Sequence, residues 1–182
     1  MMHNNYSIIY ADPPWHYAER RTATTFGGGV TDKYPTMTVD EIAQIPVGDW
    51  CADRSLLLLW CTMPYLMRAQ RVIEAWGFEY VTVAFVWVKT NPKAGTVFRG
   101  VGNYTQSNAE LCLLGRRGRP LSRAHRDVSQ IVLEPRREHS RKLDCVRDRI
   151  VRLFGDRPRL EMFARTRTPG WDVWGNDVDR FT

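Results

Sequence analysis

Short, nearly continuous apolar runs recur along this 182-residue chain, and helical patterns or polar loops separate them. Apolar runs of about four to eight residues are typical of strands buried on both faces of a sheet. Two other segments have apolar residues at helical spacing and each ends at a glycine, and a capping box starts a short helix at residues 38–41. This alternation predicts an α/β fold with a mostly parallel sheet and helices on both faces. The predicted strands are residues 6–11, 55–61, 80–88, 110–114, 129–133 and 159–164, and the longer predicted helices are residues 64–76 and 143–154.

The length of the chain fits one domain, so we expect residues 1–182 to form a single unit. No apolar run approaches the roughly eighteen residues of a membrane span, and residues 1–15 lack the features of a secretory signal. We therefore expect a cytoplasmic protein that has no membrane partner. The four cysteines are widely spaced and form no CxxC pair, so no metal site is expected.

Positive charge is concentrated in the second half of the chain. Residues 1–90 carry 7 Lys and Arg against 9 Asp and Glu, whereas residues 91–182 carry 19 against 11. One-sided basic charge is the usual footprint of a protein that binds a phosphate backbone, although a solvated basic surface without a partner has the same composition.

The most informative motif is Asp12-Pro13-Pro14-Trp15, which follows the first predicted strand. Two prolines fix a rigid turn and remove two backbone donors, so the carbonyls act only as acceptors. The aspartate adds a side-chain acceptor and the tryptophan adds a flat apolar surface. Adenine, a planar ring with an exocyclic amine, matches that set, while a strand-ending turn with a packed tryptophan is the structural alternative.

Further motifs follow in order and match a known family. The chain resembles the DPPW N6-adenine methyltransferases, which include the catalytic subunit of the eukaryotic mRNA adenosine methyltransferase and small bacterial and phage enzymes. The resemblance implies a Rossmann-like methyltransferase fold with permuted motif order and S-adenosylmethionine as methyl donor, without a metal. The matching segments after DPPW are residues 34–42 (YPTMTVDEI), 56–62 (LLLLWCT), 76–91 (WGFEYVTVAFVWVKTN) and 161–177 (EMFARTRTPGWDVWGND).

The resemblance also implies roles for individual residues. Asp12, with the Pro13 carbonyl, would hold the donor amine and accept a hydrogen bond from adenine N6, and Trp15 would stack on the base. Glu110 matches a carboxylate near the target base. The donor would be held by Lys142 at its carboxylate and by Arg165 and Asn176 at its ribose, with Thr168 and Asp177 at further donor positions where the mRNA enzyme has other residues.

Two Gly-containing loops and one basic segment are candidates for substrate contact. We expect residues 19–33 and 99–104 to gate the substrate. The segment at residues 116–126 (RRGRPLSRAHR) is the best candidate for contact with a phosphate backbone. The predicted contacts are Arg20, Arg21, Lys93 and Arg99 near phosphates, Tyr104 near the base, and Arg116 and Arg117 on the backbone.

Together these features predict an enzyme that methylates the N6 amine of adenine in DNA. DNA is favoured because a compact chain is more similar to the bacterial and phage members, which generally act on DNA. The same reaction on RNA adenosine is the first alternative. A catalytically inactive nucleic-acid-binding homologue is the second, although Asp12 and Trp15 are both intact here.

Overall fold

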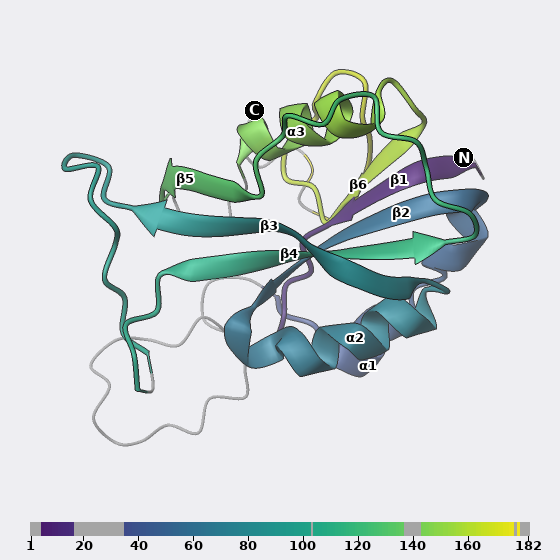
Figure 1. Cartoon of the computed structure of the whole chain (residues 1–182). Helices are drawn as coiled ribbons and strands as arrows, with labels where there is room; N and C mark the ends of the chain where they lie inside the picture. The colour runs from purple at the N-terminus through teal and green to yellow at the C-terminus, as the bar shows by residue number, and fades with distance from the viewer. Residues whose placement is uncertain (1–4, 17–34, 103, 137–142, 177, 179–182) are drawn as a thin grey trace.

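A computed structural model describes residues 5–16, 35–102, 104–136, 143–176 and 178, and these residues form a seven-stranded sheet (Figure 1). Across the sheet the strand order is β5-β3-β4-β2-β1-β6-β7. The first strand has the predicted bounds, the next five differ from their predicted bounds by a few residues, and β7 was not predicted as a strand. The strands are β1 (Tyr6–Ala11), β2 (Cys51–Thr62), β3 (Glu79–Thr90), β4 (Ala109–Arg117), β5 (Ile131–Pro135), β6 (Arg159–Met162) and β7 (Asp172–Trp174).

The sheet is mixed but mostly parallel. Strand β1 is an interior strand that pairs in parallel with β2 and β6, and the pairs β6–β7 and β3–β5 are also parallel. Strand β4 runs in the opposite direction, because it pairs antiparallel with both β2 and β3. The predicted α/β fold is therefore confirmed, with one reversed strand that the apolar pattern did not reveal.

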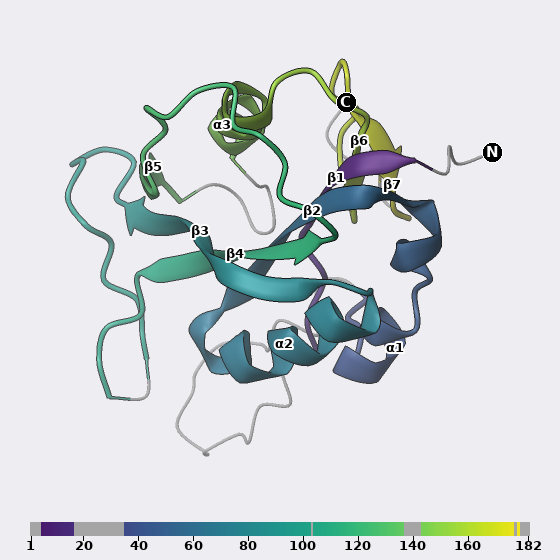
Figure 2. The ribbon, with the colours of Figure 1, turned by 45° about the vertical axis from the view of Figure 1, so that its right-hand side comes forward.

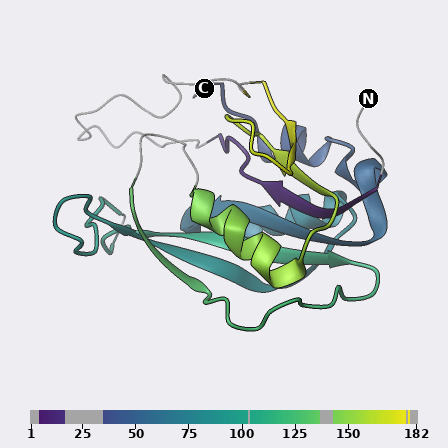
Figure 3. The same cartoon turned by 90° about the horizontal axis from the view of Figure 1, so that it is seen from above.

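Helices cover both faces of this sheet, as predicted. Helices α1 (Val39–Ala43) and α2 (Leu66–Ala75) lie on one face, and α3 (Asp144–Phe154) lies across the other (Figures 1 and 2). Two short 3₁₀ turns, η2 (Val47–Trp50) and η3 (Met63–Tyr65), flank β2. The view from above shows α3 running along the sheet (Figure 3). Among the described helices, none combines the length and the apolar character needed to cross a membrane.

The central strands are almost continuously apolar because both of their faces are buried. In β1, Ile9 packs into the core beneath α1 and α2, whereas Ile8 packs into the core beneath α3. In β2, Leu57 and Leu58 alternate in the same way. Successive side chains of a strand point to opposite faces, so a strand between two helical layers has no polar side.

Candidate active site

All strands of the described sheet except β4 run in the same direction, and the edge at which they end is here called the carboxyl edge. The last residue of β1 pairs with Met162 in β6, which in turn pairs with Trp174 in β7. Asp12, Arg165 and Asn176 follow these three strands within three residues. Three of the sequence-predicted site residues therefore leave adjacent strands at the same place, where ligands gather in open α/β sheets.

The backbone after β6 is unusual at this edge. Phe163 has a φ of 59°, in the left-handed region that non-glycine residues rarely adopt. The next residue, Ala164, donates a backbone hydrogen bond to the Trp174 carbonyl (3.2 Å), and the Phe163 and Trp174 rings pack edge to face with centroids 5.2 Å apart. This turn fixes where the chain carries Arg165 relative to the end of β7.

The DPPW turn is held by its own backbone and by the segment at residues 35–38. The Pro13 carbonyl accepts a hydrogen bond from Trp15 N (2.9 Å), and the Pro14 carbonyl accepts one from Met37 N (2.8 Å). His16 N donates to the Met37 carbonyl (2.8 Å), so the two segments form a short parallel bridge. A carbonyl oxygen has two lone pairs, and Pro13 therefore keeps the capacity for a second donor.

Trp15 is packed into the protein. Its side chain is 4% exposed, its indole N–H donates to the Trp60 carbonyl (3.0 Å), and its ring packs against Tyr65 with centroids 5.5 Å apart. The Tyr65 hydroxyl donates in turn to the His16 carbonyl, which connects η3 to the residue that follows the DPPW motif. Stacking of a base on Trp15 stays a prediction, and it requires neighbouring side chains to move.

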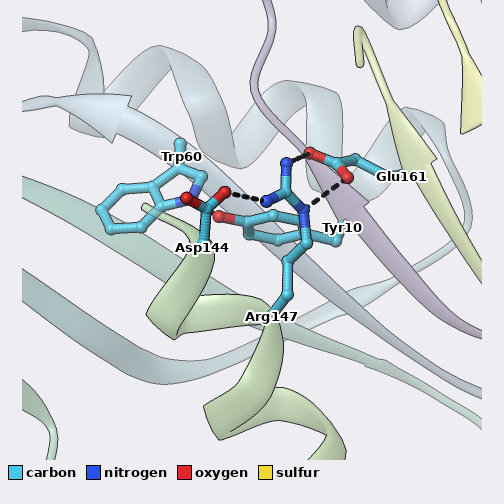
Figure 4. A network of polar contacts seen from close by, with 5 residues as sticks. All are labelled: Tyr10, Trp60, Asp144, Arg147 and Glu161. Atoms are coloured by element: carbon cyan, nitrogen blue, oxygen red, sulfur yellow. Dashed lines mark hydrogen bonds and ion pairs between the residues drawn. The ribbon is translucent and has the colours of Figure 1, made fainter. Parts of the chain in front are cut away.

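A buried polar network includes Tyr10, two residues before Asp12 (Figure 4). Tyr10 in β1 pairs in register with Glu161 in β6. Arg147 of α3 donates to both oxygens of Glu161, Nε to Oε2 (2.7 Å) and Nη2 to Oε1 (3.0 Å), and its Nη1 donates to Asp144 Oδ1 (2.7 Å). The side chains of Arg147 and Glu161 are 8% and 7% exposed. The Trp60 indole N–H donates to the Tyr10 hydroxyl (2.8 Å).

The electrostatics of this network involve Asp12. Burial raises the pKa of the Glu161 carboxyl above its ordinary value; the hydrogen bonds and charge of Arg147 oppose that rise, and the Asp12 carboxylate adds to it. Burial acts against the charge of Arg147, yet the hydrogen bonds and charge of Glu161 give a net increase in the pKa of the guanidinium. Arg147 therefore supplies the positive charge that offsets the repulsion between the carboxylates of Glu161 and Asp12 near the carboxyl edge.

Glu110 also lies at the carboxyl edge, because reversed β4 begins where its neighbours end. It is opposite Thr62 in β2 and Trp87 in β3. Lys89 Nζ lies 2.6 Å from Glu110 Oε1 and 5.0 Å from the centroid of the Trp87 ring. This partly buried ion pair holds the Glu110 carboxylate two strands away from β1.

The predicted nucleic-acid contacts divide between the two ends of the sheet. Tyr104 and Arg99 are exposed on the connection between β3 and β4, at the carboxyl edge. Arg116 and Arg117 end β4 and pair in register with Leu56 and Ser55, near the start of β2, so they lie at the opposite edge. Arg116 forms an ion pair with Glu79 (3.0 Å) and Arg117 donates to the Gly48 carbonyl (2.6 Å). The structure does not bring these two arginines to Asp12.

Thr168 lies in a cavity of about 640 Å³ between α3, residues 124–125 and the loop after β6. Arg147 and Trp171 line the same cavity, but Asp12, Arg165 and Asn176 do not.

The predicted residues Arg20, Arg21, Lys142 and Asp177 lie outside the described residues. No group of three or more metal-ligating side chains occurs within the described ranges.

Sequence reasoning missed three members of the site region: Arg147, Glu161 and Lys89. A signal was present for Arg147, since it falls on the same helical face as the apolar Val146 and Ile150. A charge on a buried face requires a partner, and Glu161 is an acid between two apolar residues of β6, Leu160 and Met162. Lys89 had no comparable signal, because strand ends commonly carry lysine.

Comparisons with known proteins identify one family. A family model described as MT-A70 matches residues 6–177. The type II methyltransferase M.MunI of a Mycoplasma species is 35% identical over 95% of this chain and 78% of its own length. A probable N(6)-adenosine-methyltransferase of Oryza sativa is 31% identical over 96% of this chain, and the catalytic subunit of the Homo sapiens N(6)-adenosine-methyltransferase is 28% identical over 96%. The chain spans 23% and 28% of the lengths of these two eukaryotic relatives.

Proposed function

Because this chain belongs to the MT-A70 family of methyltransferases, we propose that it transfers a methyl group from S-adenosylmethionine to the N6 amine of adenine in DNA. The observation that carries the proposal is the position of Asp12. Asp12 follows the interior strand β1 at the carboxyl edge, between Glu110 on one side of the sheet and Arg165 and Asn176 on the other. In this proposal residues 1–182 act as one methyltransferase domain.

The residues at the ends of β1, β6 and β7 fit the methyl donor chemically. A carboxylate (Asp12) accepts from an ammonium group, a guanidinium (Arg165) donates to oxygens, and an amide (Asn176) both donates and accepts. That donor set matches a molecule with an amino-acid end and ribose hydroxyls. When bound, S-adenosylmethionine supplies a methyl group on a sulfonium, which is already activated for transfer without a metal.

The protein must then orient a poor nucleophile. The lone pair of the adenine N6 amine is delocalised into the ring, and hydrogen bonds that its protons donate favour electron density on nitrogen. Asp12 and the second lone pair of the Pro13 carbonyl are the proposed acceptors, within the rigid turn described above. Catalysis would consist mainly of positioning and of fixed charges around the reacting nitrogen.

Glu110 is proposed to contact the target base from the other side. Lys89 fixes this carboxylate at 2.6 Å, so Glu110 is a preorganised acceptor rather than a mobile side chain. Trp15 contributes by packing the turn in place, and stacking on the base is its further proposed role.

The support for DNA is the match to the Mycoplasma type II methyltransferase along 78% of that protein. Adenosine in RNA is the second candidate, and the observation that favours it is the similarity over 96% of this chain to N(6)-adenosine-methyltransferases. An inactive nucleic-acid-binding homologue is the third candidate. Its test is donor binding, because such a protein need not bind S-adenosylmethionine.

One experiment tests the reaction and the substrate together. The protein is incubated with S-adenosylmethionine labelled at its methyl group and with DNA and RNA oligonucleotides of matched sequence, and the modified nucleosides are identified by mass spectrometry. We expect N6-methyladenine in DNA. Label on RNA alone would support the second candidate, and no label on either polymer would contradict the proposed reaction.

Asp12→Ala is the matching test of the site. Loss of the central acceptor is expected to reduce methyl transfer at least about 10²–10³-fold, the scale seen when one transition-state hydrogen-bond group is removed. Asp49→Ala is the control, because Asp49 is an exposed carboxylate in η2, before the start of β2. Wild-type turnover in Asp12→Ala, with both variants folded by circular dichroism, would overturn the assignment.

A further inference from the structure

The connection between β3 and β4 forms a hairpin that projects from the carboxyl edge (Figures 1 and 2). Residues 97–102 and 104–107 are here called the arm. Antiparallel bridges join Thr90 to Val97 at its base and Gly100 to Ser107 farther out. Near the tip, the side chains of Val101 and Tyr104 are almost completely exposed.

The arm is built so that its two sides approach closely. Gly100 N donates to the Ser107 carbonyl and Ser107 N donates to the Gly100 carbonyl, both at 3.1 Å. A Cβ on Gly100 would lie 2.3 Å from the Ser107 oxygen, and one on Gly102 would lie 2.2 Å from the Thr105 oxygen. No other residue type fits these positions without moving the backbone, so the narrow tip depends on both glycines.

The base of the arm is anchored to the sheet. Phe98 N donates to the Lys89 carbonyl (2.8 Å), and the Arg136 guanidinium lies 4.3 Å from the centroid of the Phe98 ring. The Lys89–Glu110 ion pair adds a further contact where β3 and β4 meet the arm. The result is a fixed base with an apolar tip.

The tip has the chemistry of a nucleic-acid wedge. Single exposed apolar side chains are ordinary on a protein surface, but Val101 and Tyr104 are the two most exposed large apolar residues among those described. Exposed cations flank them: Lys93 and Arg99 on the connection itself and Arg136 beside its base. Proteins that kink or open a duplex insert apolar side chains between base steps while nearby cations contact the phosphates.

The position of the arm suits this task. Neighbouring strands lie about 4.8 Å apart, so Glu110 at the base of the arm lies two strands, roughly 10 Å, from the strand that carries Asp12. A duplex adenine must leave the helix before its N6 amine can reach a site at the end of β1. The tip projects beyond this base, so a wedge there would act on base pairs next to the target rather than on the target itself.

We propose that the arm is a duplex-opening wedge, which inserts Tyr104 and Val101 into the base stack beside the target adenine. This inference rests on the proposed function and specifies its substrate as double-stranded DNA. It predicts that the arm contributes to kcat/KM only when the target adenine is base-paired.

The test compares one target sequence in three forms: single strand, matched duplex, and duplex with a mismatch opposite the target adenine. In Val101→Ala/Tyr104→Ala we expect kcat/KM on the matched duplex to fall at least about tenfold. Single-strand activity should change less than about twofold, and the mismatch should restore most of the loss because it is already unpaired. Tyr80→Ala is the matched control, since Tyr80 is a partly exposed tyrosine near the start of β3.

Equal losses on all three forms would assign Tyr104 to base binding and overturn the wedge, as would no loss on any form. A second measurement does not depend on methyl transfer. A duplex with 2-aminopurine next to the target should become more fluorescent when it binds the wild-type protein and not when it binds the double variant. An increase in fluorescence without methylation would support the wedge and contradict the proposed reaction. Methylation without an increase in fluorescence would support the reaction and contradict the wedge.

Discussion

At the scale of single residues, Arg147 has the most demanding position in the molecule. It is buried on α3 between the carboxylates of Glu161 and Asp144, and Asp12 adds negative charge nearby. A buried ion pair gives little net stability compared with an apolar pair, but removing one partner leaves an uncompensated charge. We therefore interpret the Arg147–Glu161 pair as a support for the end of β1 rather than as part of the reaction itself.

Arg147→Met is expected to lower the free energy of unfolding by about 3–5 kcal/mol near pH 8 and by less near pH 5. Without Arg147, the folded-state pKa of Glu161 rises further above its unfolded value. Stability contributed by the protonated carboxyl is then present at low pH and is lost as the pH rises through that raised pKa. Urea denaturation followed by circular dichroism at both pH values measures the difference.

Two further variants test whether the unpaired Glu161 carboxylate causes this pH dependence. Arg147→Met/Glu161→Gln should recover most of the stability and remove the added pH dependence, because no carboxylate is left unpaired. Arg152→Met changes the same helix at an exposed arginine paired with Asp127, and it should have little effect. An equal cost of Arg147→Met at both pH values would show that Glu161 is not the cause.

The apolar run before DPPW predicted that Asp12 follows the end of a strand, and the structure has it directly after β1. Its central role is what the family resemblance implies, and that role stays a prediction. The sequence was less informative about Trp15, whose indole could pack or stack. A residue next to a strand end can face either the core or a ligand, and only the contact with Tyr65 and the Trp60 carbonyl shows how this ring packs. The direction of a side chain at such a turn depends on tertiary contacts that a single sequence does not encode in a readable pattern.

At the scale of the elements, the reversed strand β4 has the largest effect on the site. The apolar run at residues 110–114 predicted a strand correctly, but the run has the same appearance in either direction. A signal was present in the connection: residues 91–108 contain no helical pattern, and parallel neighbours need a crossover, usually a helix. Because β4 is reversed, Glu110 lies at the carboxyl edge and Arg116 lies at the opposite one.

The ends of β6 and β7 give a second prediction. Asn176→Ala and Arg165→Ala should each weaken binding of S-adenosylmethionine about tenfold, the effect of losing one or two hydrogen bonds to a polar or charged group. Titration calorimetry on the whole chain measures the affinity. The control is Asn91→Ala, whose amide donates to Thr96 after β3. Unchanged donor affinity in both Asn176→Ala and Arg165→Ala would remove these two strand ends from the donor site.

At the scale of the whole molecule, the three-layer arrangement was predictable from residue patterns, because continuous apolar runs indicate strands covered on both faces. The distribution of charge was less predictable. Composition revealed that the second half of the chain is basic, but its cations divide between the two edges of the sheet. Only the fold separates Arg99, near the carboxyl edge, from Arg116.

This division predicts which cations set the salt dependence of DNA binding. The slope of log affinity against log salt concentration changes by about 0.9 for each phosphate contact. Lys93→Ala/Arg99→Ala should therefore reduce the slope by about 2. Arg116→Ala/Arg119→Ala should change it little, since these residues lie at or just beyond the end of β4, on the opposite edge. Fluorescence anisotropy over a salt series measures both, and the reverse pattern would place the nucleic acid at the opposite edge.

The reversal of β4 also has an engineering consequence. The arm is an insertion between two strands on one half of the sheet, while the proposed donor ligands that the structure describes leave strands on the other half. The hairpin can therefore be shortened, lengthened or exchanged without altering the order of the strands that carry Asp12, Arg165 and Asn176. If the arm opens the duplex as proposed, chimeras that replace residues 97–107 should change the preference for polymer form while the ends of β1, β6 and β7 stay unchanged.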